Sequence, residues 1–267
     1  MDGPDAAAFL QGLLTNDVAA LDVGTSCHAL VLDSSGHVQA DVRVARTAPD
    51  GFTIVADTGH GKPLAALLNE FHFSEDVDII GPEPFAMVTL IAPSVTSPAG
   101  ADLVIAGRIP GTHDLIGADA ADATAAVGAE PAGAEFLETM RIEAGVPRFG
   151  VDHTRANLVQ EAGLETTAVS FDKGCYLGQE TVARVHYRGQ VNRRLAGVAL
   201  DGPAESGAAL LLDGRAVGTL TSVAVSDALG PIGLSILRRE APPGSAVVVE
   251  GTGVGGRITE LPFKKFD

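Results

Sequence analysis

The sequence contains no tryptophan and only two cysteines, Cys27 and Cys175, among its 267 residues. Two thiols allow no framework of several disulfides, and such scarcity is typical of a protein from the reducing cytoplasm. One chain with two thiols also cannot supply the four thiolates that hold an iron–sulfur cluster. Residues 1–5 include neither a basic residue nor an apolar run, so we expect no signal peptide and a cytoplasmic location.

Basic residues are also few: 18 lysines and arginines stand against 34 aspartates and glutamates, a net charge of −16. Nucleic-acid binders normally carry a basic surface, so this balance argues against a nucleic-acid partner and against an anionic membrane surface. The longest apolar runs, such as residues 85–93, are too short to span a bilayer. The seven histidines show no H-x-H or H-E-x-x-H spacing, so we predict no metal site.

What the chain has in quantity is apolar residues, 46 % of the total, which is enough for a sizeable core. Hydrophobic periodicity predicts helices and strands in mixed order before residue 192. The expected helices are 5–16, 63–71, 118–128 and 135–145, and the expected strands are 26–32, 38–46, 51–56, 77–80, 85–91 and 103–109. The sequence therefore predicts an α+β region with antiparallel sheets over residues 1–191, which two subdomains could share.

The pattern changes after residue 195, where short apolar strands alternate with Gly, Pro and Asp turns. Five strands are expected, at 195–200, 208–212, 216–225, 232–237 and 246–250. Short strands of this kind predict a small antiparallel β-barrel over residues 192–267. Residues 251–256 satisfy the dinucleotide pattern G-x-G-x-x-G, but no βαβ unit can follow so close to Pro262, so we expect a loop there.

The segment 173–194, KGCYLGQETVARVHYRGQVNRR, combines features of a reactive thiol site. Gly174 and Gly178 flank Cys175, and a helix is expected from Gln179. The helix N-terminus favours a thiolate over a thiol, and the nearby Lys173 adds positive charge. The alternative is an inert cysteine; that interpretation holds for Cys27, which lies in an expected strand without such neighbours.

The same segment is locally basic, since Glu180 is the only acid beside Lys173, Arg184, Arg188, Arg193 and Arg194. Glu180 and Arg184 are four residues apart and could form an ordinary helix pair. Alternatively, the arginines could bind an anionic ligand, either a folate tail or a phosphate. Upstream, the carboxylate of Glu161 could accept hydrogen bonds from a pterin ring, or it could be a solvated loop side chain.

The pattern K-G-C-Y-x-G-Q-E-x-V-A-R, followed by R-G and N-R-R, resembles the signature of the YgfZ family of folate-binding proteins, relatives of the glycine cleavage T-protein (GcvT), an aminomethyltransferase. The resemblance extends over nearly the whole chain. Other similar stretches are FLQGLLTND at 9–17, R-x-E-x-G-x-P-x-x-G-x-D at 141–152 and QEAGL at 160–164.

This resemblance implies a T-protein-like fold with a ring-like arrangement of subdomains, tetrahydrofolate as the ligand, and support of iron–sulfur cluster assembly or repair. Its partners would be iron–sulfur client proteins or assembly machinery. It implies that Cys175 is the distinguishing residue and that Glu161 holds the pterin. Lys173, Gln179, Glu180, Arg184 and Arg188 match or adjoin the signature, and Asp41 is aligned with an acid near the folate nitrogens.

Two other interpretations remain open from the sequence. A one-carbon transferase of the T-protein type would need an acid such as Asp41 but would not need Cys175. A non-catalytic folate-binding module would make Cys175 structural. The reactivity of the Cys175 thiol distinguishes the last interpretation from the first.

Overall fold

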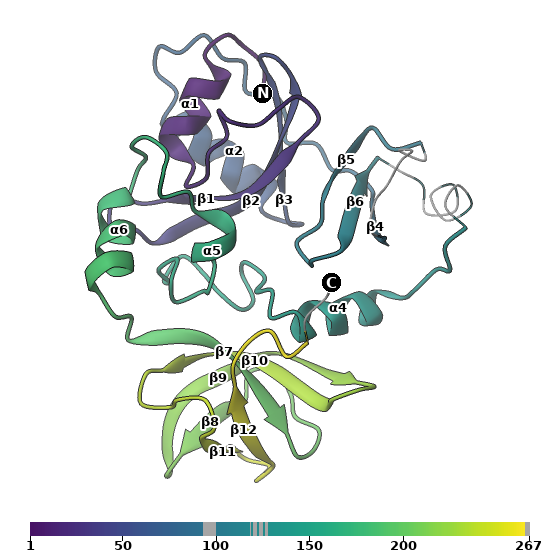
Figure 1. Cartoon of the computed structure of the whole chain (residues 1–267), viewed down its shortest axis with the longest axis vertical. Coiled ribbons are helices and arrows are strands. Elements are labelled where there is room, and N and C mark those ends of the chain that lie inside the picture. The colour runs from purple at the N-terminus through teal and green to yellow at the C-terminus, as the bar shows by residue number, and fades with distance from the viewer. Residues whose placement is uncertain (93–99, 118, 120–121, 123–124, 126–127, 265–267) are drawn as a thin grey trace. The chain divides into compact units, whose positions relative to one another are not determined.

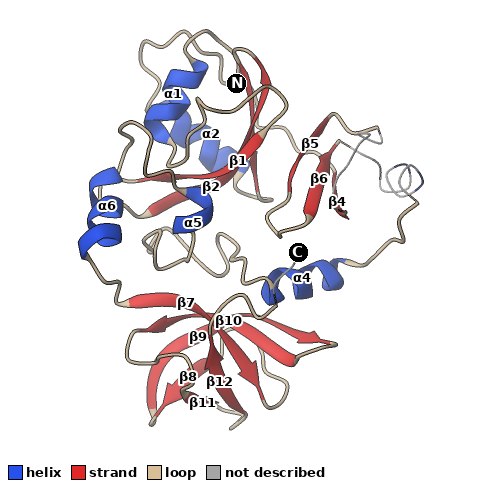
Figure 2. Ribbon diagram, viewed as in Figure 1, coloured by secondary structure: helices blue, strands red, loops and turns tan. Residues whose placement is uncertain are grey.

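The computed structural model describes residues 1–92, 100–117, 119, 122, 125 and 128–264 (Figure 1). Its elements are helices and antiparallel strands in mixed order, which confirms the predicted α+β class (Figure 2). The chain forms two compact units, each built from two separate stretches. The first unit is Met1–Pro131 with Glu165–Ala183, and the second is Ala132–Leu164 with Arg184–Asp267.

The first unit contains a three-stranded sheet in the order β1-β2-β3. The strands are β1 (Ser26–Leu32), β2 (Val38–Ala48) and β3 (Gly51–Ala56), as the hairpin pattern predicted. Because side chains alternate along β2, Val42 and Val44 face the core that helices α1 (Ala6–Leu13) and α2 (Gly61–Glu70) cover. Asp41 and Arg43 therefore point to the opposite face of the sheet.

A second three-stranded sheet in this unit has the order β4-β6-β5. Its strands are β4 (Met87–Ile91), β5 (Leu103–Ala106) and β6 (Thr112–Ile116). The sequence interpretation missed β6, because Thr, His and Asp dilute its apolar pattern. The strand expected at 77–80 is wrong: only Asp78 pairs there, in an isolated bridge with Asp2. The two sheets meet through Ala45, Val55, Ile105 and Ile116.

The segment carrying Cys175 belongs to the first unit and follows the short helix α5 (Glu165–Ala168). Helix α6 (Gln179–Arg188) begins at the predicted residue. The helix expected at 118–128 falls mostly outside the described residues. The helix expected at 135–145 is α4 (Ala134–Glu143), in the second unit.

The second unit contains a closed antiparallel barrel with the strand order β10-β7-β12-β11-β8-β9. The strands are β7 (Arg193–Leu200), β8 (Ala209–Leu212), β9 (Arg215–Ser226), β10 (Gly230–Arg238), β11 (Ala246–Val249) and β12 (Gly255–Thr259). The predicted barrel is confirmed with one strand more than expected. The loop expected at 251–256 is wrong in its last two residues, because Gly255 and Gly256 begin β12.

No helix among the described residues has both the length and the apolar character needed to cross a membrane. The boundary predicted at residue 192 and the ring-like arrangement of subdomains stay predictions.

Candidate functional site

Lys173 connects two stretches that the sequence analysis treated separately. Its Nζ donates hydrogen bonds to the backbone oxygens of Gln11 (2.8 Å), Leu14 (2.6 Å) and Asn16 (3.0 Å). These oxygens lie at and just beyond the C-terminal end of α1, whose last turn has no basic residue of its own. The ammonium thus satisfies carbonyls that the helix leaves open and complements its dipole. All three protons of Lys173 are used in this way.

Burial lowers the pKa of Lys173 to about 8, although the charges of Asp17 and Cys27 oppose part of this shift. The same ammonium lies 5.2 Å from the centre of the Tyr176 ring. The expected help of Lys173 to the Cys175 thiol stays a prediction, since the contacts of its Nζ are with α1.

The loop between Lys173 and α6 is also held on its other side. The backbone N–H of Leu177 donates to the oxygen of Gly12 at 3.2 Å. Gly178 has φ +81°, and a Cβ there would lie 2.5 Å from the backbone oxygen of Asp33, in the turn after β1. Only glycine fits both conditions. The Cys175 loop is therefore fixed between α1 and the β1–β2 turn.

The two cysteines differ in environment. Cys175 is exposed, whereas Cys27 is partly buried and packs against the core of the first sheet. Burial raises the pKa of Cys27 to about 11, with Lys173 lowering it and Asp17 raising it to smaller extents. Cys27 is therefore a poor nucleophile at neutral pH, as the sequence suggested. Cys175 is the accessible thiol of the two.

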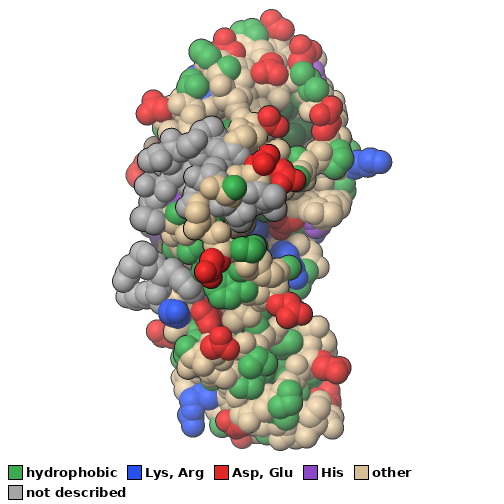
Figure 3. All heavy atoms as spheres, turned by 90° about the vertical axis from the view of Figure 1, so that its right-hand side faces the viewer, with side chains coloured by type: hydrophobic (Ala, Val, Ile, Leu, Met, Phe, Trp, Pro, Cys, Tyr) green, Lys and Arg blue, Asp and Glu red, His purple; other side chains and the backbone are tan. Residues whose placement is uncertain are grey.

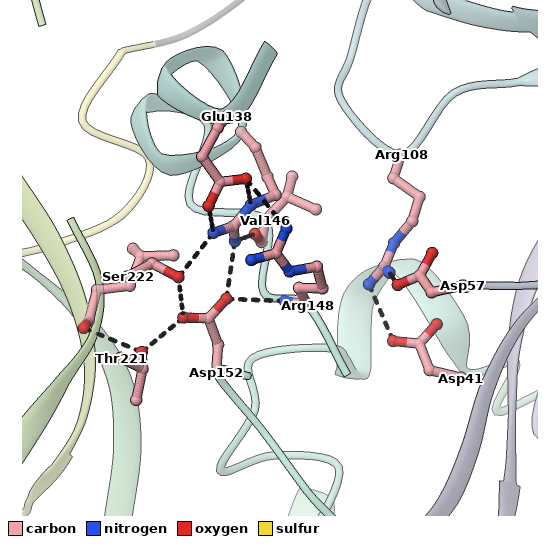
Figure 4. A network of polar contacts seen from close by, with 11 residues as sticks. Asp41, Asp57, Arg108, Glu138, Val146, Arg148, Asp152, Thr221 and Ser222 are labelled. Atoms are coloured by element: carbon pink, nitrogen blue, oxygen red, sulfur yellow. Dashed lines mark hydrogen bonds and ion pairs between the residues drawn. The ribbon is translucent and has the colours of Figure 1, made fainter. Parts of the chain in front are cut away.

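Asp41 is buried on the face of the first sheet opposite α1 and α2. Its Oδ1 lies 2.7 Å from Nε2 of His28. Its Oδ2 accepts a hydrogen bond from Arg108 at 2.9 Å (Figure 4). Arg108 also reaches Asp57 at 3.5 Å. Nearby on β2, Arg43 pairs with Asp114 of β6. Both carboxylate oxygens of Asp41 are therefore paired with a basic side chain, and further ion pairs lie beside it on the same face of the sheet.

Sequence reasoning missed His28 and Arg108 as the partners of Asp41. The observed register makes His28 a diagonal neighbour of Asp41 across the two strands, but a bulge between Val31 and Leu32 sets that register, so the predicted hairpin alone gave no signal for His28. Arg108 is separated from Asp41 by 67 residues, so no local pattern could have identified it.

The stretch 141–152 forms a buried network in the second unit. Arg141 donates to Asp152 (2.8 Å), to Glu138 (2.6 Å) and to Ser222 of β9 (2.7 Å). In Figure 4 the side chains of these three acceptors point toward a common centre. The hydrogen bond from Arg141 holds the pKa of Glu138 below its usual value. Asp152 also accepts from Thr221 and Ser222. These residues attach α4 to the barrel, so this stretch stabilises the fold.

Glu161 lies in the loop before α5, also in the second unit. Its Oε2 accepts hydrogen bonds from the backbone of Leu158 (3.3 Å) and from Asn157 (3.4 Å). Its own backbone oxygen accepts from Leu195 of β7 at 2.8 Å, which fixes the loop on the barrel. The carboxylate is half-buried, and a carboxylate can accept about four hydrogen bonds. Its Oε1 therefore retains capacity for a ligand.

The remaining predicted site residues lie on α6. Gln179 and Glu180 form its first turn, and Arg184 and Arg188 are exposed on its later turns. Among the residues that the structure describes, Glu180 and Arg184 form no ion pair, which was one of the two arrangements that the sequence left open. The structure thus places Lys173, Cys175, Gln179 and Glu180 on one continuous segment of the first unit. Asp41 belongs to the same unit but lies on β2, where it pairs with His28 and Arg108. Among the described residues, no group of three or more His, Cys, Asp or Glu side chains could hold a metal ion.

Comparison with known proteins bears on this geometry. Residues 1–93 match the family model of the GCVT N-terminal domain. An aminomethyltransferase of Rubrobacter xylanophilus is 29 % identical over 295 residues, covering 98 % of this chain and 79 % of that protein. A chloroplastic Arabidopsis thaliana protein described as a transferase is 35 % identical over 139 residues. That match covers 52 % of this chain and only 32 % of the plant protein.

The crystal structure of glycine cleavage system aminomethyltransferase T from Bartonella henselae decides the fold. It superposes with a TM-score of 0.84 over 98 % of this chain and 82 % of that chain, at 22 % sequence identity. The chain has the aminomethyltransferase fold. A T-protein-like fold was predicted from the sequence motifs and is confirmed.

Proposed function

We propose that the chain binds tetrahydrofolate and supports the assembly or repair of iron–sulfur proteins in the cytoplasm, with Cys175 as the working thiol. The observation that carries this proposal is the Cys175 loop. It presents an exposed thiol directly before α6 while α1 and the β1–β2 turn hold it in place. A fixed and accessible thiol suits contact with another protein better than it suits a structural role.

Glu161 supports the folate part of the proposal. A pterin presents an amide N–H beside an exocyclic amine, and Oε1 of Glu161 can accept a hydrogen bond from one of these donors. The hydrogen bonds from Leu158 and Asn157 orient this carboxylate before any ligand arrives. The residues present therefore fit the ligand that the sequence resemblance implies.

Two cysteines in one chain mean that any iron–sulfur cluster would be shared with a partner. The proposed partners are the client proteins or the assembly machinery. In that contact, Cys175 would act as a thiolate nucleophile or a transient ligand.

Calorimetric titration with tetrahydrofolate tests the folate part, using the wild type, Glu161→Gln and Cys175→Ala. We expect the wild type to bind, Glu161→Gln to weaken binding at least about tenfold, the loss of about one charged hydrogen bond, and Cys175→Ala to bind as the wild type does. Absence of wild-type binding would contradict the proposal. Cys175→Ala should instead lower the activity of iron–sulfur enzymes in cells that carry it as the sole copy.

A one-carbon transferase is the second candidate, and Asp41 favours it. A buried acid held by His28 and Arg108 is the kind of group that such a reaction needs near the folate nitrogens. The two candidates predict opposite results. Asp41→Asn would abolish aminomethyl transfer while Cys175→Ala spared it, whereas the iron–sulfur role would depend on Cys175.

A further inference from the structure

Four arginines lie where β7 begins and β10 ends, with Arg193 and Arg238 paired on one face of the sheet, and we call them the arginine corner: Arg193, Arg194, Arg238 and Arg239. The pairing of β7 with β10 places Arg193 directly opposite Arg238, and Arg194 opposite Leu237. Directly paired side chains project to the same face of a sheet with Cβ atoms about 5 Å apart. Arg193 and Arg238 are both exposed.

The other two arginines are held by hydrogen bonds. Arg194 donates to the backbone oxygen of Ala241 at 2.9 Å, and Arg239 donates to Oε1 of Gln190 at 2.8 Å. The backbone N–H of Arg239 also donates to the oxygen of Asn192 at 2.9 Å. These contacts attach the loop after α6 to the end of β10 and fix the position of the corner.

The charge of the corner is poorly compensated. Arg193 has no ion-pair partner among the residues that the structure describes. Arg238 lies 3.8 Å from Glu240, and these side chains are 55 % and 63 % exposed, so the pair contributes little. Like charges directly opposite each other in a sheet destabilise it. Such a cluster is unusual in a chain of net charge −16, where acidic side chains are scattered over the face in Figure 3 and basic ones are few.

We propose that the arginine corner is a docking surface for an acidic segment of a partner protein. A guanidinium binds a carboxylate through two parallel hydrogen bonds, and two adjacent guanidiniums match neighbouring carboxylates on a short peptide. The partner would neutralise the Arg193–Arg238 repulsion on binding. Arginine is also enriched in protein interfaces. This inference does not depend on folate binding.

Two other occupants fit less well. A nucleic acid needs many phosphate contacts for affinity, and four arginines on an otherwise acidic chain offer few of them. A second copy of this chain has abundant carboxylates, but its net charge of −16 repels an identical molecule. The experiment below distinguishes these occupants.

The test measures fluorescence polarisation of a labelled hexaglutamate peptide on the full chain, with hexaglutamine and an oligothymidylate of equal charge as comparison probes. The double variant Arg193→Glu/Arg238→Glu removes the corner. Its matched control is Arg155→Glu/Arg215→Glu, two exposed arginines elsewhere in the second unit, which changes the net charge equally. Circular dichroism checks that both variants are folded, and sedimentation reports their oligomeric state.

We expect hexaglutamate to bind with an affinity that falls as salt rises, because exposed charges are screened. The corner variant should bind at least about tenfold more weakly, and the control variant within about twofold of the wild type. Absence of hexaglutamate binding would overturn the proposal, as would equal weakening by both variants. Tighter binding of the oligonucleotide would replace it with a nucleic-acid site. A wild-type dimer that the corner variant dissociates would replace it with self-association.

A neutral variant provides a second readout. Arg193→Gln/Arg238→Gln removes the repulsion without adding charge, so its melting temperature should equal or exceed that of the wild type while hexaglutamate binding is lost. A lower melting temperature would mean that the arginines stabilise the fold, and the docking proposal would fail. If the wild type binds hexaglutamate but no tetrahydrofolate, only the proposed function fails.

Discussion

At the scale of single residues, Lys173 shows how a motif residue can serve a neighbouring element. Its ammonium is buried on three carbonyl oxygens around the end of α1. Lys173→Met keeps much of the side-chain volume but leaves these acceptors without a donor. An unsatisfied buried acceptor costs about 1–3 kcal/mol, so we expect the free energy of unfolding to fall by at least about 2 kcal/mol. Urea denaturation at pH 7 measures this.

Lys173→Arg is the matched variant, because it keeps the charge and the donors and should recover part of the loss. We expect the Cys175 loop to be displaced in Lys173→Met and largely restored in Lys173→Arg. The alkylation rate of Cys175 should change in Lys173→Met and return towards the wild-type value in Lys173→Arg. Wild-type stability in Lys173→Met would show that the three hydrogen bonds contribute nothing net.

The pKa of Lys173 also gives a pH dependence. Burial lowers this pKa from 10.5 to about 8 in the folded protein. Between these values the unfolded chain retains the proton that the folded chain has released, so the contribution of Lys173 to stability rises with pH. We expect the stability of the wild type relative to Lys173→Met to increase from pH 8 towards pH 10.5, measured by urea denaturation across that range. A difference that declines with pH would contradict the assigned direction.

The two cysteines make a separate prediction about reactivity. Alkylation at pH 7.5 should modify Cys175 completely before Cys27 reacts, since Cys175 is exposed and burial raises the pKa of Cys27 to about 11. Mass spectrometry of tryptic peptides measures both rates. In urea the two rates should become similar. Faster labelling of Cys27 in the folded protein would contradict the assignment of Cys175 as the accessible thiol.

At the scale of elements, the sequence correctly predicted the helices and strands whose position depends on residues close by in the chain. The hairpin of β1 and β2 and the start of α6 follow from alternation, turn residues and flanking glycines, and they lie where predicted. Strands β6 and β12 were missed, because polar residues or glycines dilute their patterns, although each pairs with the strand just before it as well as with a more distant one.

The candidate site divides in the same way. The Cys175 segment could be recognised as a motif. The contact of Lys173 with Leu14 spans 159 residues, so no local sequence pattern predicts it. The polar stretch 141–152 was noted as part of the resemblance. Its role in attaching α4 to the barrel follows only from the structure, in which Arg141 donates a hydrogen bond to Ser222.

The attachment of α4 to the barrel predicts that Asp152→Asn destabilises the protein strongly. This substitution keeps the shape of a fully buried side chain but removes the charge that faces Arg141. Removing one partner of a buried ion pair costs about 3–5 kcal/mol, so we expect a loss of that order in the free energy of unfolding. Glu240→Gln, which breaks the exposed pair with Arg238, is the control and should cost less than about 0.5 kcal/mol. If Asp152→Asn and Glu240→Gln lowered the free energy of unfolding equally in urea denaturation, the proposed role of Asp152 in attaching α4 to the barrel would be contradicted.

At the scale of the whole molecule, the two units are each made of two chain stretches, so neither is a contiguous segment. The boundary predicted at residue 192 would separate the barrel from α4. Yet Ile142 of α4 is fully buried against Ile232 and Leu234 of β10. Glu143 also accepts a hydrogen bond from Ser226, which is buried at the end of β9.

An isolated fragment of residues 192–267 should therefore be less stable than the barrel within the full chain. Without α4 it exposes Ile232 and Leu234 and leaves Ser222 and Ser226 without their partners, and each uncovered aliphatic side chain costs about 1.5–3 kcal/mol. Adding a synthetic peptide of residues 132–164 should raise the fragment's melting temperature, whereas the same peptide with Ile142→Asp should not. If the fragment alone melts at the temperature of the full chain, the barrel is an independent domain and α4 does not contribute to its stability.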